Sequence, residues 1–514
     1  MHWYDLNMSY APLPLLVIVL AASFSFLPAF GQTEPITPIT GTPVPGLESY
    51  DQAMTTIITK YGIPGAALAV AYHGRLVYSR GFGYADLATK NPVAPDSLFR
   101  IASTSKAITA VTILRLVEEG KLDLDARAFK ILNIEPPGGQ VLDQRIWNIT
   151  IRELLEHSGG WGRKPFDPMF LSTSVATALG APAPASCETT IRYMMMTSLL
   201  DFEPGTRFAY SNFGYCVLGR IIERITGARY EDYVRTEVLA PMGIADMQIG
   251  HTQSAFRALK EVHYYDADNR SVQSVFQNIT DPVPYPYGGF YIEALDSVGG
   301  WIASAQDLVR FAVSIDGARP PAYLQPQTVD IMLARNSALW PSGDHWYALG
   351  WDVKYPSWWH DGGVGGSRSY LVRMPNGVAW AALFNTCRCA TEEDFGPDVD
   401  QSLRNTFDGI KSWPSWDLFQ VETTTSSTAS SYYPELTETT TTLTTTYATS
   451  TPVATTSAVS SLVQTTRAPE TETATSQQLT ASFLPTVLPL LVGTLLAIVV
   501  ACGIYLRRRG KQNG

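Results

Sequence analysis

The chain has 514 residues, enough for two or three domains, and a formal net charge of −10 at pH 7. The 37 Lys and Arg are outnumbered by 47 Asp and Glu and form no basic block in the middle, which argues against a nucleic-acid partner. Hydrophobic residues make up 45% of the chain, so a core can form and any disulfide among the five cysteines is an accessory.

The N-terminus has the pattern of an export signal. An apolar run over residues 12–30 ends at Ala29-Phe30-Gly31, a small-x-small arrangement typical of a signal-peptide cleavage site. No Lys or Arg precedes the run, so either the amino group supplies the charge or translation starts at Met8. We predict a signal peptide over residues 1–31, with an uncleaved anchor as the alternative. A Pro/Thr-rich linker over residues 32–46 follows.

The C-terminal part has the pattern of a stalk and a membrane anchor. Residues 421–482 are rich in Ser and Thr and poor in large apolar residues, which predicts an O-glycosylated stalk. Residues 486–506 are nearly all apolar and long enough to span a bilayer, and residues 507–514 form a basic tail. We therefore expect a type I single-pass membrane protein whose globular domain, residues 47–415, is extracellular or lumenal.

An exported domain would carry its cysteines in an oxidising compartment and its sequons where glycans are added. Three pairings are open among four cysteines, and Cys216 lies on a helical apolar face, which favours burial over a disulfide. These four are Cys187, Cys216, Cys387 and Cys389. Three N-x-[ST] triplets are candidate glycosylation sites, headed by Asn148, Asn269 and Asn278.

Hairpins are predicted near both ends of the domain, and most of the predicted helices lie between them. One hairpin is predicted around His73-Gly74, near the start of the domain, with strands over residues 66–72 and 75–78. A second is predicted around Asn376-Gly377, near its end, with strands over residues 368–374 and 378–384. Helices are predicted over residues 51–61, 103–119, 150–156, 212–226, 230–239, 304–315 and 400–411, and residues 163–198 are mainly loop-like. This order predicts an α/β (α+β) fold: an antiparallel sheet flanked by helices, with an all-helical subdomain.

The start of the second predicted helix contains a candidate nucleophile. Ser103 and Lys106 are three residues apart, so a helix would place the lysine amine beside the serine hydroxyl. A serine hydroxyl needs a neighbouring base, and a lysine can serve if its pKa is lowered. The N–H groups of the first helical turn can stabilise an oxyanion. The pattern is short, so an ordinary surface helix start is the competing interpretation.

Two further triplets follow along the chain. In Tyr210-Ser211-Asn212, the pKa of the phenol is expected to fall beside a lysine cation, and the Asn212 amide can both donate and accept hydrogen bonds. His360-Asp361-Gly362 leads into Gly363 at the edge of a predicted strand, where glycine lets a substrate backbone approach closely.

The three triplets, in this order, resemble those of the serine β-lactamase/penicillin-binding-protein superfamily, on the class C-like branch that includes family VIII esterases and LACTB-like proteins. The resemblance covers most of residues 48–412. It implies that Ser103 is the acylated nucleophile and that Lys106 and Tyr210 share the proton transfers, with the identity of the base left open. Asn212 would orient Lys106 and touch the acyl side chain, and the N–H groups of Ser103 and Gly363 would form the oxyanion hole.

The third triplet departs from the family pattern. His360 replaces the usual lysine and is mostly neutral at pH 7, and Asp361 would repel a carboxylate. Both changes disfavour β-lactams and peptidoglycan stems and leave esters, amides or peptides with neutral ends. His157 is interpreted as a structural histidine at a helix end.

We therefore expect a serine hydrolase that acts on an ester, amide or peptide through an acyl-Ser103 intermediate. No metal or cofactor is expected, since the sequence has neither H-E-x-x-H nor paired CxxC, and the absence of G-x-S-x-G excludes an α/β-hydrolase. The alternative is a catalytically inactive ectodomain used for binding or adhesion. Substrate identity and oligomeric state are left open.

Overall fold

The computed structural model describes residues 37–162, 167–387 and 394–419 of the chain. The predicted signal peptide, stalk, membrane-spanning segment and basic tail lie outside these residues. Among the residues described, none of the helices has the length and apolar character needed to cross a membrane.

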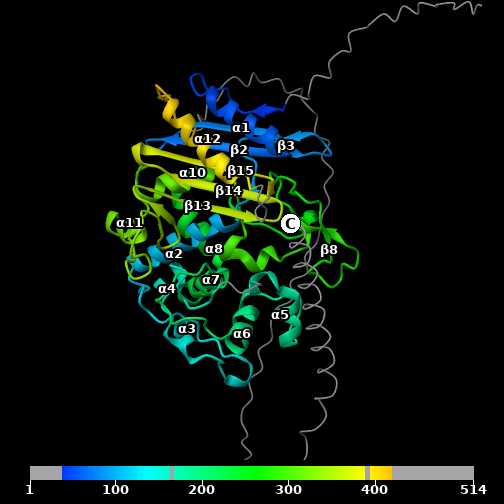
Figure 1. The fold of residues 1–514 in the computed structure, drawn as a ribbon, viewed down its shortest axis with the longest axis vertical. Coiled ribbons are helices and arrows are strands. Elements are labelled where there is room, and N and C mark those ends of the chain that lie inside the picture. The colour runs from blue at the N-terminus through cyan, green and yellow to red at the C-terminus, as the bar shows by residue number, and fades with distance from the viewer. Residues whose placement is uncertain (1–36, 163–166, 388–393, 420–514) are drawn as a thin grey trace, which may run out of the picture. The chain divides into compact units, whose positions relative to one another are not determined.

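The described residues contain a nine-stranded antiparallel sheet with the strand order β1-β3-β2-β15-β14-β13-β12-β11, and β4 pairs with β3. The N-terminal hairpin joins the C-terminal strands where β2 pairs with β15, so the two ends of the domain form one sheet (Figure 1). The strands are β1 Ile39–Thr40, β2 Gly65–Tyr72, β3 Arg75–Asp86, β4 Asn91–Pro92, β11 Trp346–Tyr347, β12 Asp352–Lys354, β13 Ser357–Val364, β14 Ser367–Arg373 and β15 Val378–Phe384.

Both predicted hairpins are confirmed. The β2–β3 turn has positive φ at His73 (47°) and Gly74 (75°), as a type I′ turn requires. The β14–β15 turn likewise has positive φ at Asn376 (68°) and Gly377 (79°). Strand β3 continues to Asp86, well past the predicted end at residue 78, because it pairs with β1 and β4 beyond the hairpin.

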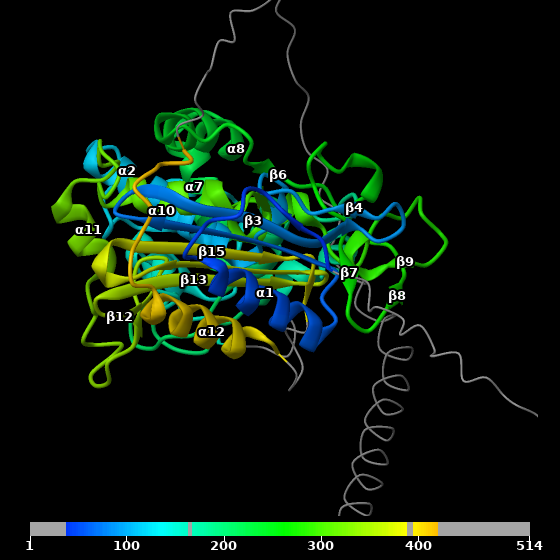
Figure 2. The ribbon, with the colours of Figure 1, turned by 90° about the horizontal axis from the view of Figure 1, so that it is seen from above.

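Helices cover both faces of the sheet, as predicted (Figure 2). Alternate residues of β2 belong to two apolar clusters, since successive side chains of a strand point to opposite faces. One cluster lies under α1 (Glu48–Tyr61) and α12 (Gly396–Gly409), and the other includes α10 (Ala305–Ile315) and α2 (Ser105–Glu118). The backbone N–H of Leu418 donates to the carbonyl of Leu76, so the chain still packs on β3 after α12.

The helical part of the domain lies mainly between β5 (Phe99–Arg100) and β10 (Trp301–Ala303). The prediction that residues 163–198 are mainly loop is wrong, because α5 and α6 form there; α5 is short and its small residues give a weak pattern. The helices are α3 Ala128–Leu132, α4 Ile151–Leu155, α5 Ser172–Leu179, α6 Cys187–Thr197, α7 Asn212–Thr226, α8 Tyr230–Tyr233, α9 Asp296–Gly299 and α11 Pro326–Leu333. A π-helical segment over Val234–Leu239 continues α8.

The remaining strands are short and form three small sheets outside the nine-stranded sheet. A three-stranded sheet has the order β5-β10-β6, and two pairs join β7 to β16 and β8 to β9. The bounds are β6 Gln248–Ile249, β7 Tyr265–Asp266, β8 Ser271–Val272, β9 Val283–Pro284 and β16 Thr386–Cys387.

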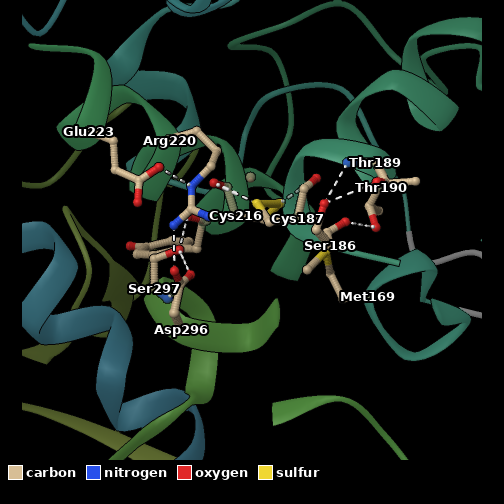
Figure 3. Close-up of a disulfide and its surroundings, with 12 residues drawn as sticks. Met169, Ser186, Cys187, Thr189, Thr190, Cys216, Arg220, Glu223, Asp296 and Ser297 are labelled. Atoms are coloured by element: carbon tan, nitrogen blue, oxygen red, sulfur yellow. Dashed lines mark hydrogen bonds and ion pairs between the residues drawn. A yellow bond between two sulfur atoms is a disulfide. The ribbon is translucent and has the colours of Figure 1, made fainter. Parts of the chain in front are cut away.

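A disulfide joins α6 to α7 through Cys187 and Cys216 (Figure 3). Cys216 is fully buried, as predicted, but the expectation that it would not be bridged is wrong. The packing of the two helices brings the Cα atoms of Cys187 and Cys216 to 5.9 Å, within the range of a disulfide. Cys387 is disulfide-bonded as well.

Candidate active site

Ser103 lies in the tight turn that begins the central helix. A 3₁₀ turn over Ala102–Thr104 runs directly into α2, which ends at Glu118 and is followed by Gly120 with φ 67°. The predicted helix is therefore confirmed. Ala102 has φ 45°, an uncommon value for a residue with a side chain. Such unfavourable backbone angles concentrate at functional sites, where the surrounding structure imposes them.

Strand β14 fixes the turn by hydrogen bonds to the backbone just before Ser103. The Oγ of Ser367 donates to the carbonyl of Arg100, and the Oγ of Ser369 donates to the carbonyl of Ile101 at 2.6 Å. Both serines are fully buried, so their hydrogen bonds are not exposed to competition from solvent.

Gly362 brings β13 against the same turn. A Cβ on Gly362 would lie 2.2 Å from the carbonyl oxygen of Ile101 and 2.8 Å from the backbone nitrogen of Ser103. Strand β12 pairs with β13 only as far as Trp359, so the rest of this edge is free to face the turn. Gly362 therefore allows a close approach of the protein's own backbone, whereas the approach of a substrate backbone stays a prediction.

The geometry of the turn also depends on Arg100, for which the sequence analysis predicted no role of its own. Its fully buried guanidinium donates to the carbonyl oxygens of Pro286 and His251, both at 2.6 Å. Its carbon Cζ lies 4.4 Å from the centre of the Tyr264 ring. Arg100 therefore ties the loops around these residues to β5, the strand that leads into the turn.

Lys106 is placed as the sequence predicted. Its Nζ lies 3.0 Å from the Oγ of Ser103 and donates to the carbonyl of Val298 at 2.9 Å. The side chain is fully buried, with Nζ 5.0 Å from the ring centre of Tyr210 and 5.6 Å from that of Tyr215. Burial lowers the pKa of Lys106 to about 7, against the opposing effect of nearby carboxylates. A neutral amine, able to accept a proton, is thus available near pH 7.

The carbonyl of Val298 is held in place by α9. Figure 3 shows Arg220 of α7 between Glu223 and Asp296, the first residue of α9, with an ion pair to each. The Oγ of Ser297 donates to the carbonyl of Tyr215 at 3.0 Å. These contacts hold α9 against α7 next to Val298, whose carbonyl accepts the hydrogen bond from Lys106.

Tyr210 contacts the nucleophile, but its electrostatics differ from the prediction. Its hydroxyl is hydrogen-bonded to Ser103. Burial raises the pKa of Tyr210 well above 10, and the bond to Ser103 offsets this only in part. The expectation of a lowered pKa is wrong because desolvation of the phenolate outweighs the effect of the partly neutral Lys106. Tyr210 is therefore a phenol at neutral pH.

Asn212, the first residue of α7, has a different partner from the one expected. Its Nδ2 donates to Oδ2 of Asp167 at 2.7 Å, and no hydrogen bond to Lys106 is present among the described residues. The sequence analysis missed Asp167, although Asp-Pro is a recognisable turn start. The Oδ1 of Asp167 accepts from the backbone N–H of Met169 at 2.9 Å, which fixes the carboxylate at the head of this turn.

His360 and Asp361 are not among the described residues that line the cavity, and the effects on a substrate predicted for them stay predictions. His360 is buried, with Nδ1 2.6 Å from the carbonyl oxygen of Asp361 and Nε2 3.1 Å from the hydroxyl of Tyr347. Because a carbonyl only accepts, Nδ1 carries the proton. Burial lowers the pKa of His360, so the ring is neutral at pH 7. The next side chain along the strand points to the other face, where Asp361 pairs with Arg368 at 3.1 Å.

His157 packs against the Tyr210-Ser211-Asn212 triplet. Its Nδ1 accepts from the backbone N–H of Ser211 at 3.1 Å, and its ring centre lies 4.2 Å from that of Tyr210. Burial lowers the pKa of His157 well below 6.5. These contacts agree with the interpretation of His157 as a structural residue, in this case one that packs against the candidate site.

Four of the predicted site residues line one cavity of about 450 Å³. Ser103, Tyr210, Asn212, Gly363 and Asp167 all line it. The rest of its wall is largely apolar and includes Trp161, Pro168, Phe170, Met194, Phe213, Leu295, Val298 and Val364. Among the residues described, no group of three or more His, Cys, Asp or Glu is arranged to hold a metal ion. The arrangement places a serine hydroxyl, a partly neutral lysine amine and a phenol together at the edge of a largely apolar pocket.

The three sequons lie on the surface of the domain. Asn148, Asn269 and Asn278 are all exposed, so a glycan at any of them would not disturb the core. None of them lines the cavity that contains Ser103.

Known proteins resemble this chain over most of the domain. Penicillin-binding protein 4 of Amycolatopsis lactamdurans is 29% identical over 377 residues, covering 70% of this chain and 90% of that protein. The mitochondrial serine beta-lactamase-like protein LACTB of Mus musculus is 22% identical over 427 residues, covering 66% of this chain and 74% of its own length. A D-amino acid amidase from Ochrobactrum anthropi SV3 has the same fold, with a TM-score of 0.54 at 24% identity, covering 70% of this chain and 99% of that one. A family model described as beta-lactamase matches residues 50–397, and this chain therefore belongs to the beta-lactamase family of serine hydrolase folds.

Proposed function

We propose that this protein is a serine hydrolase that cleaves an ester, amide or peptide substrate through an acyl-Ser103 intermediate, on the class C-like branch of the family. The observation that carries the proposal is the 3.0 Å contact between a buried, partly neutral Lys106 and the Ser103 hydroxyl. An activated serine needs such a base within hydrogen-bond reach. The free cavity beside it leaves room for a substrate carbonyl.

In the proposed mechanism, neutral Lys106 takes the hydroxyl proton as Ser103 Oγ attacks the carbonyl carbon. The N–H groups of Ser103 and Gly363, both at the cavity, stabilise the oxyanion. The phenol of Tyr210 delivers a proton to the leaving alcohol or amine, and Lys106 replaces it. Water then attacks the acyl group by the reverse proton path, releases the acid and restores Ser103. The lowered pKa of Lys106 and the raised pKa of Tyr210 favour Lys106 over Tyr210 as the base.

The substrate side of the proposal follows from the cavity wall. Its apolar side chains suit an apolar acyl group, and none of the described residues that line it is a Lys, Arg or His that could bind a carboxylate. This supports esters, amides or peptides whose ends are not anionic. No metal or cofactor is invoked in any step.

We also propose that the domain works outside the cytoplasm as part of a type I membrane protein. The Cys187–Cys216 disulfide supports an oxidising compartment, and the exposed sequons at Asn148, Asn269 and Asn278 are accessible to glycosylation. Release of these glycans by an endoglycosidase, seen as a mobility shift, would test the compartment.

Steady-state hydrolysis of p-nitrophenyl acyl esters by the full-length protein tests the function. We expect Ser103→Ala to lower kcat/KM by about a thousandfold or more with the protein still folded. Ser254→Ala, a change at an exposed serine of a surface turn, is the matched control and should leave turnover intact. Unchanged turnover in Ser103→Ala would remove Ser103 from the mechanism. A folded wild type without turnover would favour the alternative of a binding or adhesion module.

A further inference from the structure

Among the described residues that line the cavity, Asp167 is the one carboxylate, and none is a Lys, Arg or His. Its two hydrogen bonds come from neutral donors, the Asn212 amide and the Met169 N–H. Within the described residues, no ion pair neutralises this carboxylate. Lys106 acts on it from a longer range, and burial keeps the pKa of Lys106 near 7. The cavity therefore contains a carboxylate whose charge lacks a close partner.

Asn212 contributes a second acceptor in the wall of the same cavity. Since a carboxylate only accepts hydrogen bonds, the amide group that faces Asp167 must be the NH₂, which turns Oδ1 the other way. This Oδ1 is buried and has no hydrogen-bond partner among the described residues. Buried polar atoms are nearly always paired, so an unpaired acceptor in a cavity wall indicates a missing donor.

An acceptor pair of this kind matches an ammonium group, which has three donors, no acceptor and a positive charge. A neutral alcohol would satisfy Oδ1 without using the charge of Asp167, and a carboxylate would be repelled. The neighbouring wall is apolar, formed in part by Trp161, Phe170 and Met194. A side chain next to the ammonium group could pack there while the carbonyl reaches Ser103.

We propose that Asp167 and Asn212 form an ammonium subsite, and that the substrates are aminoacyl esters, amides or peptides with a free amino group. The inference rests on the proposed hydrolase function and names its substrate class. In the reaction, Ser103 Oγ bonds to the aminoacyl carbonyl carbon, and the bond to the alcohol or amine breaks. Water then releases the free amino acid. The ammonium group itself is unchanged.

The test compares matched esters with the full-length protein: phenylalanine methyl ester, in both enantiomers, and methyl 3-phenylpropanoate, which lacks only the amino group. We expect kcat/KM to favour at least one enantiomer of the amino ester by about tenfold or more, the range of a hydrogen bond to a charged group. Asp167→Asn should reduce this ratio about tenfold. Asp167→Glu, which restores the charge, should recover part of it.

Asp400→Asn removes one negative charge on α12, across the sheet from the cavity, and should leave the ratio unchanged. An equal kcat/KM for amino and desamino esters, or a ratio untouched by Asp167→Asn, would overturn the subsite while leaving the hydrolase intact. A folded wild type that hydrolyses neither these esters nor a p-nitrophenyl ester would overturn both proposals. Melting temperatures of all variants separate these outcomes from loss of folding.

Discussion

The Nζ of Lys106 lies 3.0 Å from the Oγ of Ser103, in full burial and beneath the rings of Tyr210 and Tyr215. The same burial that makes this position costly for an ammonium ion makes the amine a usable base. The chemistry of the site and its stability are therefore coupled through one side chain.

The first prediction concerns the pH dependence of the reaction. Because the pKa of Lys106 is lowered to about 7, kcat/KM for a neutral ester should rise with pH through an apparent pKa near 7 and then level off. Tyr210→Phe should lower the rate but keep this inflection, since burial raises the pKa of Tyr210 well above 10. A pH profile in which Tyr210→Phe abolishes the inflection would assign the base to Tyr210.

Stability should respond to pH through the same lysine. The pKa of Lys106 is about 7 in the folded protein, against 10.5 for an unperturbed lysine side chain, so between these values the unfolded chain binds more protons. Its burial therefore costs most below pH 7, and the cost is relieved as pH rises towards 10.5. We expect Lys106→Met to be more stable than the wild type at pH 7, by an amount that shrinks by about 2 kcal/mol at pH 9.

Chemical denaturation at the two pH values measures this difference in unfolding free energy. Lys130→Met, a change at an exposed lysine of α3, is the control and should show no comparable trend. A constant difference between Lys106→Met and the wild type would mean that Lys106 keeps an ordinary pKa.

A methyl group at Gly362 should damage the site without touching a catalytic side chain. Its Cβ would overlap the carbonyl oxygen of Ile101 and the backbone nitrogen of Ser103, so β13 or the turn must move. We expect Gly362→Ala to lose about 1–3 kcal/mol of stability and most of its kcat. Gly409→Ala, at the end of α12 with open space around it, should match the wild type in both assays. Full activity in Gly362→Ala would show that the turn is adaptable.

The disulfide should stabilise the helical part of the domain. Cys187 and Cys216 are 29 residues apart, and a loop of that size predicts about 3–4 kcal/mol from the constrained unfolded chain. The double change of Cys187 and Cys216 to Ala should lower the unfolding free energy by about that amount, as measured by denaturant titration. Met195→Leu on α6 is a volume-conserving control for the same helix. Equal stability of the double variant and the wild type would contradict the prediction.

Much of the fold and most of the site were predictable because they depend on local patterns. The hairpin turns at His73 and Asn376 need positive φ, which the following glycines allow, and the spacing of Ser103 and Lys106 on a helix fixes their contact. These features arise from a few neighbouring residues, so the sequence contains them directly.

What escaped prediction depends on packing between distant segments. The partner of Asn212 is Asp167, 45 residues earlier, and the partner of Cys216 is Cys187, 29 residues earlier. The raised pKa of Tyr210 likewise reflects burial, which no spacing in the sequence reports. The hydrogen bond of the buried His360 to Tyr347 likewise joins two different strands.

The most direct test of the account is to find which residue becomes covalently modified. The full-length protein would be treated with a fluorophosphonate probe, and the labelled peptide identified by mass spectrometry beside Ser103→Ala and Ser254→Ala. We expect one label on Ser103, which is lost in Ser103→Ala and retained in Ser254→Ala. A folded protein that takes no label, or one labelled at another residue, would contradict the assignment of Ser103 as the nucleophile.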